Sequence, residues 1–414
     1  MTTDLAFTPA IEQAQLIRRR EISPLELVEL YLTRIQQLDS QLNSYITVMA
    51  EPALAQAKLQ TEQLGRDASV ALSSPLWGVP ISVKDLNAVA GVPCSYGVQA
   101  LKQKVPDYDD GVVTRLKQAG LIILGKTATS ELGSLPYTEP DGFPPTRNPW
   151  HLNYTPGGSS GGAAAGLAAG LSAIAQGSDG GGSIRGPAFC CGLVGIKPAR
   201  GRVSYAPIGE AQNGIATNGP LARTVPDAAA LLDVMSGYIT GDPYWLPDPS
   251  PSFLECTQLP LSPLKIAFAT DIPPVGPAHP DCAAGVLQTV QQLTDMGHQL
   301  TMACPNFTDL VEPFTCVWSA GIAATGIPGP ALGKMNRWFL GRTPSGGQYL
   351  QAVSRMQVLA RQIVAFFQNF DVLVLPTYLQ PPISIGAYAD LSPDATLEKI
   401  AQWIFPCPPF NATG

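Results

Sequence analysis

The chain has 414 residues, of which 45% are hydrophobic and 14% are charged, and its formal net charge at pH 7 is −7. This composition excludes an intrinsically disordered chain, and the lack of a Lys- or Arg-rich block argues against nucleic-acid binding. The sequence has no run of 18 apolar residues and no apolar leader after Met1, so we expect neither a membrane-spanning helix nor a signal peptide. Its eight cysteines include no C-x-x-C pair and indicate the reduced thiols of a cytoplasmic protein.

The N-terminal half alternates helical and strand patterns. Ser23, Pro24 and Glu26 predict a capping box, with Ser23 as the N-cap and Pro24 at the first helical position. Apolar residues then recur at helical spacing as far as Leu38. The further elements that we expect are a helix over 51–65, a strand at Val79–Val83, a helix at Gly111–Ala119, a strand at Leu121–Leu124, a long loop over 134–158 and an Ala- and Gly-rich helix within 157–170.

The C-terminal half follows a Pro- and Ser-rich stretch at 247–263, which indicates an excursion between two halves of the molecule. The elements that we expect here are strands at Lys265–Ala269, Gln299–Met302 and Asp371–Leu375 and helices at Cys282–Met296 and 347–369. Because Asp371–Leu375 is almost uniformly aliphatic, we expect it to be central in its sheet and buried on both faces. Helices that alternate with short apolar strands predict an α/β fold.

Gly120–Thr127 matches the P-loop pattern G-x-x-x-x-G-K-T. A P-loop needs its intervening residues in a tight loop whose N–H groups face phosphate. Here those residues are four large aliphatics, Leu121–Leu124, which are themselves the predicted strand. We therefore favour a buried strand followed by a turn over a nucleotide site.

Gly157–Gly161 matches the G-x-S-x-G pattern of a nucleophile elbow, which requires a strand before it and an acid and a histidine after it. The preceding residues Tyr154–Pro156 are not strand-like, and only His279 and His298 follow. The chain has three histidines in all, and none belongs to a ligand-type cluster. Both a Ser-His-Asp hydrolase and a metal-dependent hydrolase are therefore disfavoured.

Two Gly- and Ser-rich runs, at 155–162 and 177–188, are embedded in apolar sequence, which argues against a flexible linker. A buried loop must satisfy its backbone polar groups and therefore needs a purpose. In the second run Gly180–Gly182 precede Ser183, and three glycines can turn several N–H groups toward one point beside the serine hydroxyl. Converging N–H groups form an oxyanion hole, in which each donor contributes roughly 3 kcal/mol. Ser183 is therefore a candidate nucleophile.

A serine nucleophile needs a base, and because histidine is scarce, a neutral lysine is the next candidate. Lys84 follows the apolar strand predicted at Val79–Val83, where burial would lower its pKa. Lys126 and Lys197 also follow apolar runs. The local pattern therefore does not select among these three lysines.

These segments together resemble the amidase signature family over nearly the whole chain. The tract formed by 157–162 and 177–188 is similar to the family signature, including the spacing of 24 residues between Ser159 and Ser183. The segment 77–85 is similar to the one that carries the family's catalytic lysine. Other family-like segments are 124–127, 146–150, 195–198 and 218–223.

The resemblance implies a role for individual residues. Ser183 would be the acyl-ester nucleophile, Ser159 the bridging serine that usually follows a cis peptide bond, and Lys84 the base. The oxyanion hole would consist of the N–H groups of Gly180, Gly181, Gly182 and Ser183. The residues that would support the site are Ser160, Asp179 and Arg185.

The resemblance also implies an amidase-signature fold, a mixed twisted sheet covered by helices on both faces. We expect a single amidase domain over 1–414, with a helical N-terminal region to about residue 70, a signature core over about 71–240 and a second part over about 260–414. We expect no metal and no cofactor, a small-molecule amide as substrate, and no nucleic-acid or membrane partner. A homodimer is left open.

Thr138–Pro140 followed by Thr146–Trp150 is most similar to the branch of the 6-aminohexanoate-cyclic-dimer hydrolases, which implies linear or cyclic amides of that type as substrates. Two alternatives stay open: the A subunit of a glutamyl-tRNA amidotransferase-type complex, and an inactive truncated relative. The family pattern continues past Phe410–Gly414, so we expect this chain to lack the usual C-terminal end. We therefore expect reduced cover for Trp403, Ile404, Phe405 and Phe410.

Overall fold

The computed structural model describes residues 2–414, which divide into two compact units. The first unit comprises the described residues up to Asp179, Ser183–Glu210 and Thr217–Gln258, and the second comprises Gly180–Gly182, Ala211–Ala216 and Leu259–Gly414. The division after Gln258 falls inside the Pro- and Ser-rich stretch at 247–263. Between residues 2 and 414, none of the helices has the length and apolar character that crossing a bilayer requires.

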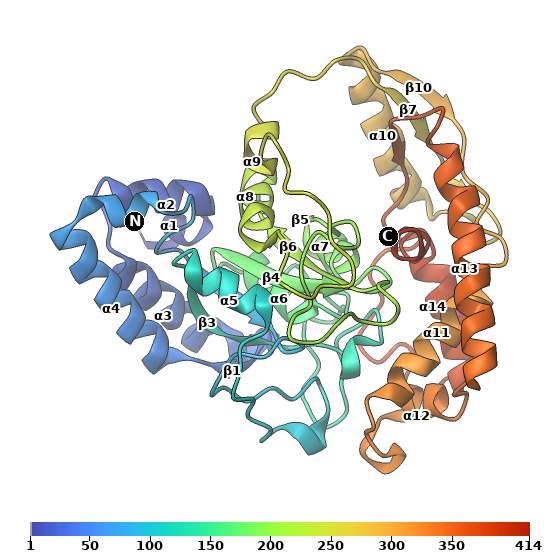
Figure 1. Cartoon of the computed structure of the whole chain (residues 1–414), viewed down its shortest axis with the longest axis horizontal. Helices are drawn as coiled ribbons and strands as arrows, with labels where there is room; N and C mark the ends of the chain where they lie inside the picture. The colour runs from blue at the N-terminus through green and yellow to red at the C-terminus, as the bar shows by residue number, and fades with distance from the viewer. Residues whose placement is uncertain (1) are drawn as a thin grey trace. The chain divides into compact units, whose positions relative to one another are not determined.

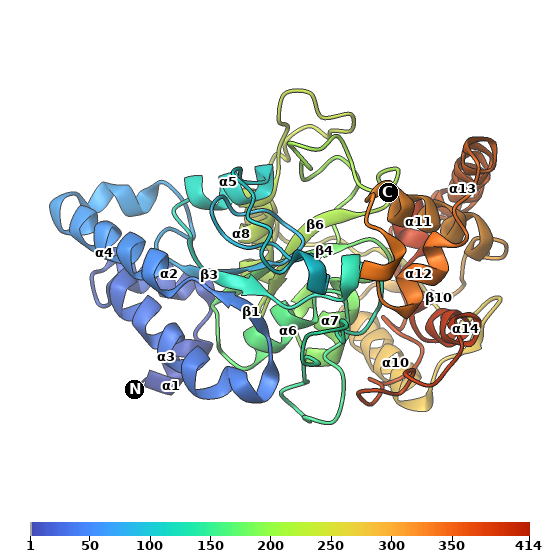
Figure 2. The same cartoon turned by 90° about the horizontal axis from the view of Figure 1, so that it is seen from below.

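The first unit contains a six-stranded mixed sheet in the order β1-β3-β2-β4-β6-β5. Its strands are β1 (Tyr45–Val48), β2 (Pro80–Lys84), β3 (Ile122–Thr127), β4 (Ile174–Asp179), β5 (Val194–Gly195) and β6 (Thr217–Ala222). Strands β3, β2 and β4 are parallel, whereas β1 and β6 run antiparallel to their neighbours (Figure 2). Every residue of β2, β3 and β6 is buried, and because side chains alternate along a strand, both faces of the sheet are covered. The predicted mixed sheet with two covered faces is therefore confirmed.

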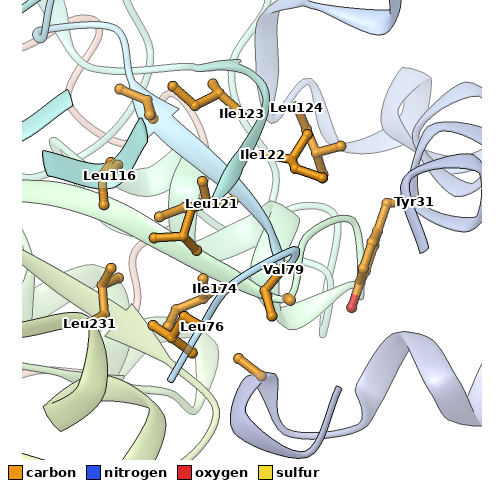
Figure 3. Close-up of a cluster of buried hydrophobic side chains, with 14 of the residues drawn as sticks. Tyr31, Leu76, Val79, Leu116, Leu121, Ile122, Ile123, Leu124, Ile174 and Leu231 are labelled. Atoms are coloured by element: carbon orange, nitrogen blue, oxygen red, sulfur yellow. The ribbon is translucent and has the colours of Figure 1, made fainter. Parts of the chain in front are cut away.

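The described residues of the first unit also form α-helices (Figure 1). They are α1 (Thr2–Phe7), α2 (Ala10–Arg18), α3 (Pro24–Leu42), α4 (Ala50–Arg66), α5 (Gly111–Gln118), α6 (Gly161–Ala168), α7 (Arg185–Cys191), α8 (Val225–Met235) and α9 (Phe253–Cys256), with short 3-10 turns η1 (Ala68–Leu72), η2 (Gln99–Leu101) and η3 (Glu131–Gly133). The core joins Tyr31 of α3, Leu116 of α5 and Leu231 of α8 to strand residues such as Ile122 and Ile174 (Figure 3). Burying these side chains is the main source of stability for the sheet that carries the site.

The capping box predicted at the start of α3 is present. The N–H of Glu26 donates to Ser23 Oγ at 3.1 Å, and the N–H of Ser23 donates to Glu26 Oε2 at 2.7 Å. Both bonds satisfy N–H groups that have no partner within the helix. The helix ends at Leu42, where Asn43 adopts a left-handed conformation.

The second unit contains a small parallel sheet in the order β10-β7-β11. Its strands and helices are β7 (Lys265–Phe268), β8 (Asp271–Ile272), β9 (Gly276–Pro277), β10 (Gln299–Met302), β11 (Val372–Val374), α10 (Pro280–Asp295), α11 (Val311–Ala324), α12 (Lys334–Leu340), α13 (Gly346–Phe366), α14 (Pro393–Ile404), α15 (Pro409–Ala412) and the turn η4 (Gly329–Ala331). Strands β8 and β9 pair with each other. Helices α11 and α13 lie side by side (Figures 1 and 2).

Two expectations for the C-terminal half are wrong. Strand β11 is not central: within the described residues it pairs with β7 alone, and Val372 is 38% exposed. Its aliphatic composition reflects packing on part of its surface, which a sequence pattern cannot distinguish from burial on both faces. The expectation of reduced cover is wrong for Trp403 and Phe405, because Trp403 packs edge-on against Tyr378 and Phe405 against Phe307. Ile404 and Phe410 are half-buried.

Candidate active site

Lys84 is the last residue of β2, and its side chain is fully buried. Lys84 Nζ lies 2.7 Å from Ser159 Oγ, 3.0 Å from Ser178 Oγ and 3.2 Å from the carbonyl oxygen of Ser178. Burial lowers the pKa of Lys84 to about 7, although the charge of Asp179 acts in the opposite direction. An amine with this pKa is partly neutral at pH 7 and can accept a proton.

The other two candidate lysines have different surroundings. Lys126 in β3 pairs with Asp85 at 2.8 Å, and both side chains are fully buried. The second carboxylate oxygen of Asp85 accepts hydrogen bonds from the N–H and the hydroxyl of Ser95 at 2.9 and 2.5 Å. Burial lowers the pKa of Lys197 to about 8, and its Nζ donates to the carbonyl oxygen of Pro198 at 2.8 Å. Of these three lysines, which all lie within residues 2–414, Lys84 alone has an amine that contacts serine hydroxyls.

Ser159 lies in the turn that leads into α6, and the peptide bond between Gly158 and Ser159 is cis, as the resemblance implied. A Cβ atom at Gly158 would lie 2.5 Å from the backbone nitrogen of Tyr137, so no larger residue fits there. Ser160 ties this turn to β4, because its Oγ donates to the carbonyl oxygen of Ser178 at 3.1 Å. Its N–H donates to the carbonyl oxygen of Ser183 at 3.2 Å, which joins the two Gly- and Ser-rich runs.

The loop before Ser183 is closed at its base by Asp179, the last residue of β4. The buried Asp179 carboxylate accepts from the N–H groups of Ile184 and Arg185 at 3.0 and 3.3 Å and from the Arg185 guanidinium at 2.9 and 3.0 Å. These bonds span Gly180–Gly182, so they restrict the loop that presents Ser183 at the start of α7. Ser183 is 7% exposed.

Two of the three glycines are closely packed inside the second unit. Gly182 has a φ of +121°, and a Cβ there would lie 2.8 Å from Cys407 Cβ. A Cβ at Gly180 would lie 3.1 Å from the ring of Trp318. Gly182 is therefore closed to larger residues, in agreement with the argument from glycine flexibility.

Two polar residues beside Lys84 were missed by the sequence argument. Ser178 contacts the amine of Lys84, and Gln176 accepts the backbone N–H of Lys84 at 3.0 Å. Ser178 could have been considered, because it lies in the Gly- and Ser-rich run 177–188. The sequence around Gln176 does not indicate a functional role, because a glutamine in an apolar strand only interrupts the hydrophobic pattern.

The two competing motifs do not form the sites that they would need. The strand β3 continues through Gly125, Lys126 and Thr127, so the P-loop string contains no phosphate-binding loop. Gly125 is explained by packing, because a Cβ there would lie 2.3 Å from the carbonyl oxygen of Thr47 in β1. Thr155 and Pro156, directly before Gly157, do not belong to a strand, although a nucleophile elbow requires a strand there. Across the described residues, no group of three or more His, Cys, Asp and Glu side chains is arranged to hold a metal ion.

Comparisons with known proteins give a consistent picture. A family model described as Amidase matches residues 26–327. A protein of Synechocystis sp. named "Putative amidase" is 52% identical over 412 residues, which cover 100% of this chain and 81% of that protein. The 6-aminohexanoate-cyclic-dimer hydrolase of Paenarthrobacter ureafaciens is 32% identical over 401 residues, 91% of this chain and 79% of that enzyme. A solved structure of 6-aminohexanoate cyclic dimer hydrolase superposes with a TM-score of 0.91 at 30% identity, covering 99% of this chain and 88% of the other.

Proposed function

This chain belongs to the amidase family and is an enzyme that hydrolyses C–N bonds, and from this premise we propose that Ser183, Ser159 and Lys84 carry out the reaction through an acyl-ester intermediate. The observation that carries the proposal is the buried contact of 2.7 Å between Lys84 Nζ and Ser159 Oγ. It supplies what a serine nucleophile lacks, a base whose pKa lies close to neutral pH.

The proposed first step forms the ester. Neutral Lys84 accepts the hydroxyl proton of Ser159, and Ser159 in turn accepts the proton of Ser183 as Ser183 Oγ bonds to the amide carbon. The carbonyl oxygen gains negative charge, which we propose is stabilised by the N–H groups of Gly180 to Ser183. The C–N bond then breaks, and the leaving amine takes the proton back through Ser159 from protonated Lys84.

The proposed second step removes the acyl group. Water gives a proton to the same relay and attacks the ester carbon, and Ser183 leaves with its proton restored. Asp179, Arg185 and Ser160 support the relay by holding the loop and the turn in place, in keeping with the hydrogen bonds that they make. Besides the substrate and water, the scheme uses side chains and main-chain groups of this chain.

For the substrate, we propose small linear or cyclic amides of the 6-aminohexanoate type. The support is the name of the relative from Paenarthrobacter ureafaciens and the TM-score of 0.91 to a structure with the same name. A panel of amides from aryl amides to cyclic oligoamides tests this proposal, with glutamine included because the A-subunit alternative requires glutaminase activity. Turnover of glutamine alone would favour that alternative.

The nucleophile is tested with a serine-reactive phosphonate followed by mass spectrometry. We expect the adduct on Ser183, and we expect Ser183→Ala to abolish both the adduct and amide hydrolysis while the thermal melt stays cooperative. An adduct on Ser159 would refute the assignment. A folded wild-type protein that neither reacts with phosphonate nor cleaves any amide would support the inactive alternative.

A further inference from the structure

A buried carboxamide in β4, that of Gln176, contacts the main chain of Lys84. The ladder of paired residues between β2 and β4 ends at the pair Val83 and Gln176. Lys84 is the next residue, and its N–H donates to Gln176 Oε1 at 3.0 Å. The side chain of Gln176 therefore bonds the first residue of β2 that lies beyond the ladder.

The other end of the Gln176 carboxamide is surrounded by acceptors. Its Nε2 lies 2.9 Å from Asn87 Oδ1, 2.8 Å from the carbonyl oxygen of Gly177 and 3.0 Å from Asn218 Oδ1. Because an N–H donor faces Oε1 and acceptors surround Nε2, only one orientation of the Gln176 amide group satisfies these contacts. Gln176, Asn87 and Asn218 are all at least 97% buried, so water does not compete for these bonds.

The side chain of Asn218 belongs to this network, although one of its two polar atoms has no hydrogen bond within residues 2–414. Its Nδ2 is buried and has no hydrogen-bond partner among the described residues. A buried unpaired donor is unfavourable, and an apolar residue of similar size would avoid it. The contact that Asn218 does make, through Oδ1 to Gln176, is consistent with a role in holding the Gln176 amide.

We propose that Gln176 is a positioning residue that holds Lys84 where its amine can exchange a proton with Ser159. This inference rests on the proposed function. The backbone around Lys84 is held on one side by the Asp85 N–H, which donates to the carbonyl oxygen of Thr127 at 3.1 Å, and on the other by Gln176. If Gln176 is lost, the N–H of Lys84 loses its bond to β4, and the amine keeps only its own contacts with Ser159 and Ser178 on that side. A shift of about 1 Å between reacting groups can cost about 100-fold in rate.

The test is a double-mutant cycle on the second-order rate at which a phosphonate labels Ser183. Gln176→Met keeps the size of the side chain and removes both ends of the amide. We expect this change to slow labelling by about 10- to 100-fold, and to lower kcat for amide hydrolysis with KM nearly unchanged. In a Lys84→Ala background the same change should cost less than about threefold, because Gln176 acts through Lys84.

The matched control is Gln60→Met. Gln60 is also a buried glutamine, and its Nε2 donates to the carbonyl oxygen of Gly120 at 2.9 Å, but its side chain makes no hydrogen bond to Lys84. We expect Gln60→Met to lower the melting temperature while leaving the labelling rate within about twofold of wild type. A similar loss of rate in both glutamine variants, or an equal loss from Gln176→Met with and without Lys84, would overturn the inference.

Asn218→Leu provides a second variant if Gln176→Met does not fold. It removes the Oδ1 contact to Gln176 together with the unpartnered Nδ2. We expect a loss of about threefold or more in labelling rate that disappears in the Lys84→Ala background, and an unchanged rate would overturn the inference. Failure of the proposed function would look different, because Lys84→Ala alone would then leave wild-type labelling intact.

Discussion

Lys126 Nζ lies 2.8 Å from Asp85 Oδ1 inside the sheet, with both side chains fully buried. Lys84, at the end of the neighbouring strand, instead faces hydroxyl and carbonyl oxygens of Ser159 and Ser178. The carboxylate compensates the charge of Lys126, whereas burial lowers the pKa of Lys84. Local sequence does not distinguish these two lysines, but one is held in an ion pair and the other is buried beside neutral oxygen atoms. They should therefore respond differently to the same substitution.

Replacing Lys126 by Met should affect stability rather than catalysis. The change leaves the Asp85 carboxylate buried without its cation, which typically costs about 3–5 kcal/mol in the free energy of unfolding. We expect kcat per folded molecule to stay close to wild type. Urea unfolding at pH 7 together with kcat measured below the transition tests both parts, and a loss of kcat equal to that of Lys84→Met would contradict them.

Replacing Lys84 by Met should have the reverse effect. The folded-state pKa of about 7 lies below the ordinary lysine value of 10.5, so the unfolded chain binds the proton more tightly. Lys84 therefore destabilises the fold most below pH 7, and this effect fades as pH rises from about 7 to 10.5. We expect Lys84→Met to abolish turnover and to raise the melting temperature at pH 7, with a smaller gain at pH 10. A lower melting temperature at pH 7 would show that the buried amine stabilises the fold.

The pH dependence of turnover should follow the neutral form of Lys84. Below the pKa of about 7 the amine carries its proton and cannot accept another one from Ser159. We expect kcat/KM to rise with pH and to reach a plateau above an apparent pKa near 7. Steady-state rates between pH 5 and 9 on one amide check this, after confirmation that the enzyme stays folded throughout. A constant kcat/KM over that range is incompatible with a neutral lysine base.

Asp179→Asn should damage catalysis through the loop that presents Ser183. An amide at this position keeps one acceptor oxygen but loses the ion pair with Arg185 and turns an N–H₂ toward it. We expect kcat to fall by about tenfold or more, since small displacements in a site have large effects on rate.

Asp227→Asn is the control for that variant. Asp227 is buried as well, and its carboxylate accepts from the N–H groups of Ala10 and Ile11 at 3.0 and 2.9 Å at the start of α2. Both variants should melt at a lower temperature, but Asp227→Asn should keep kcat near wild type. Equal kcat values for the two variants would mean that Asp179 has no particular role in the loop.

ATP should not bind despite the P-loop string at Gly120–Thr127. The residues that would have to cradle phosphate form the buried strand β3, and the lysine of the string is occupied by Asp85. Because a bound ligand raises the melting temperature by mass action, thermal melts at millimolar ATP should match melts without it. A nucleotide-dependent shift would mean that β3 opens to form a loop.

Local chemistry determines several features of this molecule independently of tertiary contacts. The capping box at Ser23 and Glu26 depends on residues three apart and is present as predicted. The strand at Gln299–Met302 has the predicted bounds, and the Gly- and Ser-rich runs could be recognised because glycine allows backbone conformations that other residues avoid. The resemblance to the amidase family came from the Gly- and Ser-rich tract and its spacing, and the family match confirms it.

Tertiary structure decided what depends on partners distant in sequence. The aliphatic strand β11 lies at an edge because its neighbours were set by the folding of the whole second unit. Asp85 pairs with Lys126, 41 residues away, and Gln176 contacts Lys84 across 92 residues, so neither bond leaves a local pattern. The pKa of Lys84 has the same origin, because its main cause is the burial of the amine by the folded chain around it. Sequence patterns report local propensity and periodicity, whereas burial and hydrogen-bond partners exist only once distant segments have packed together.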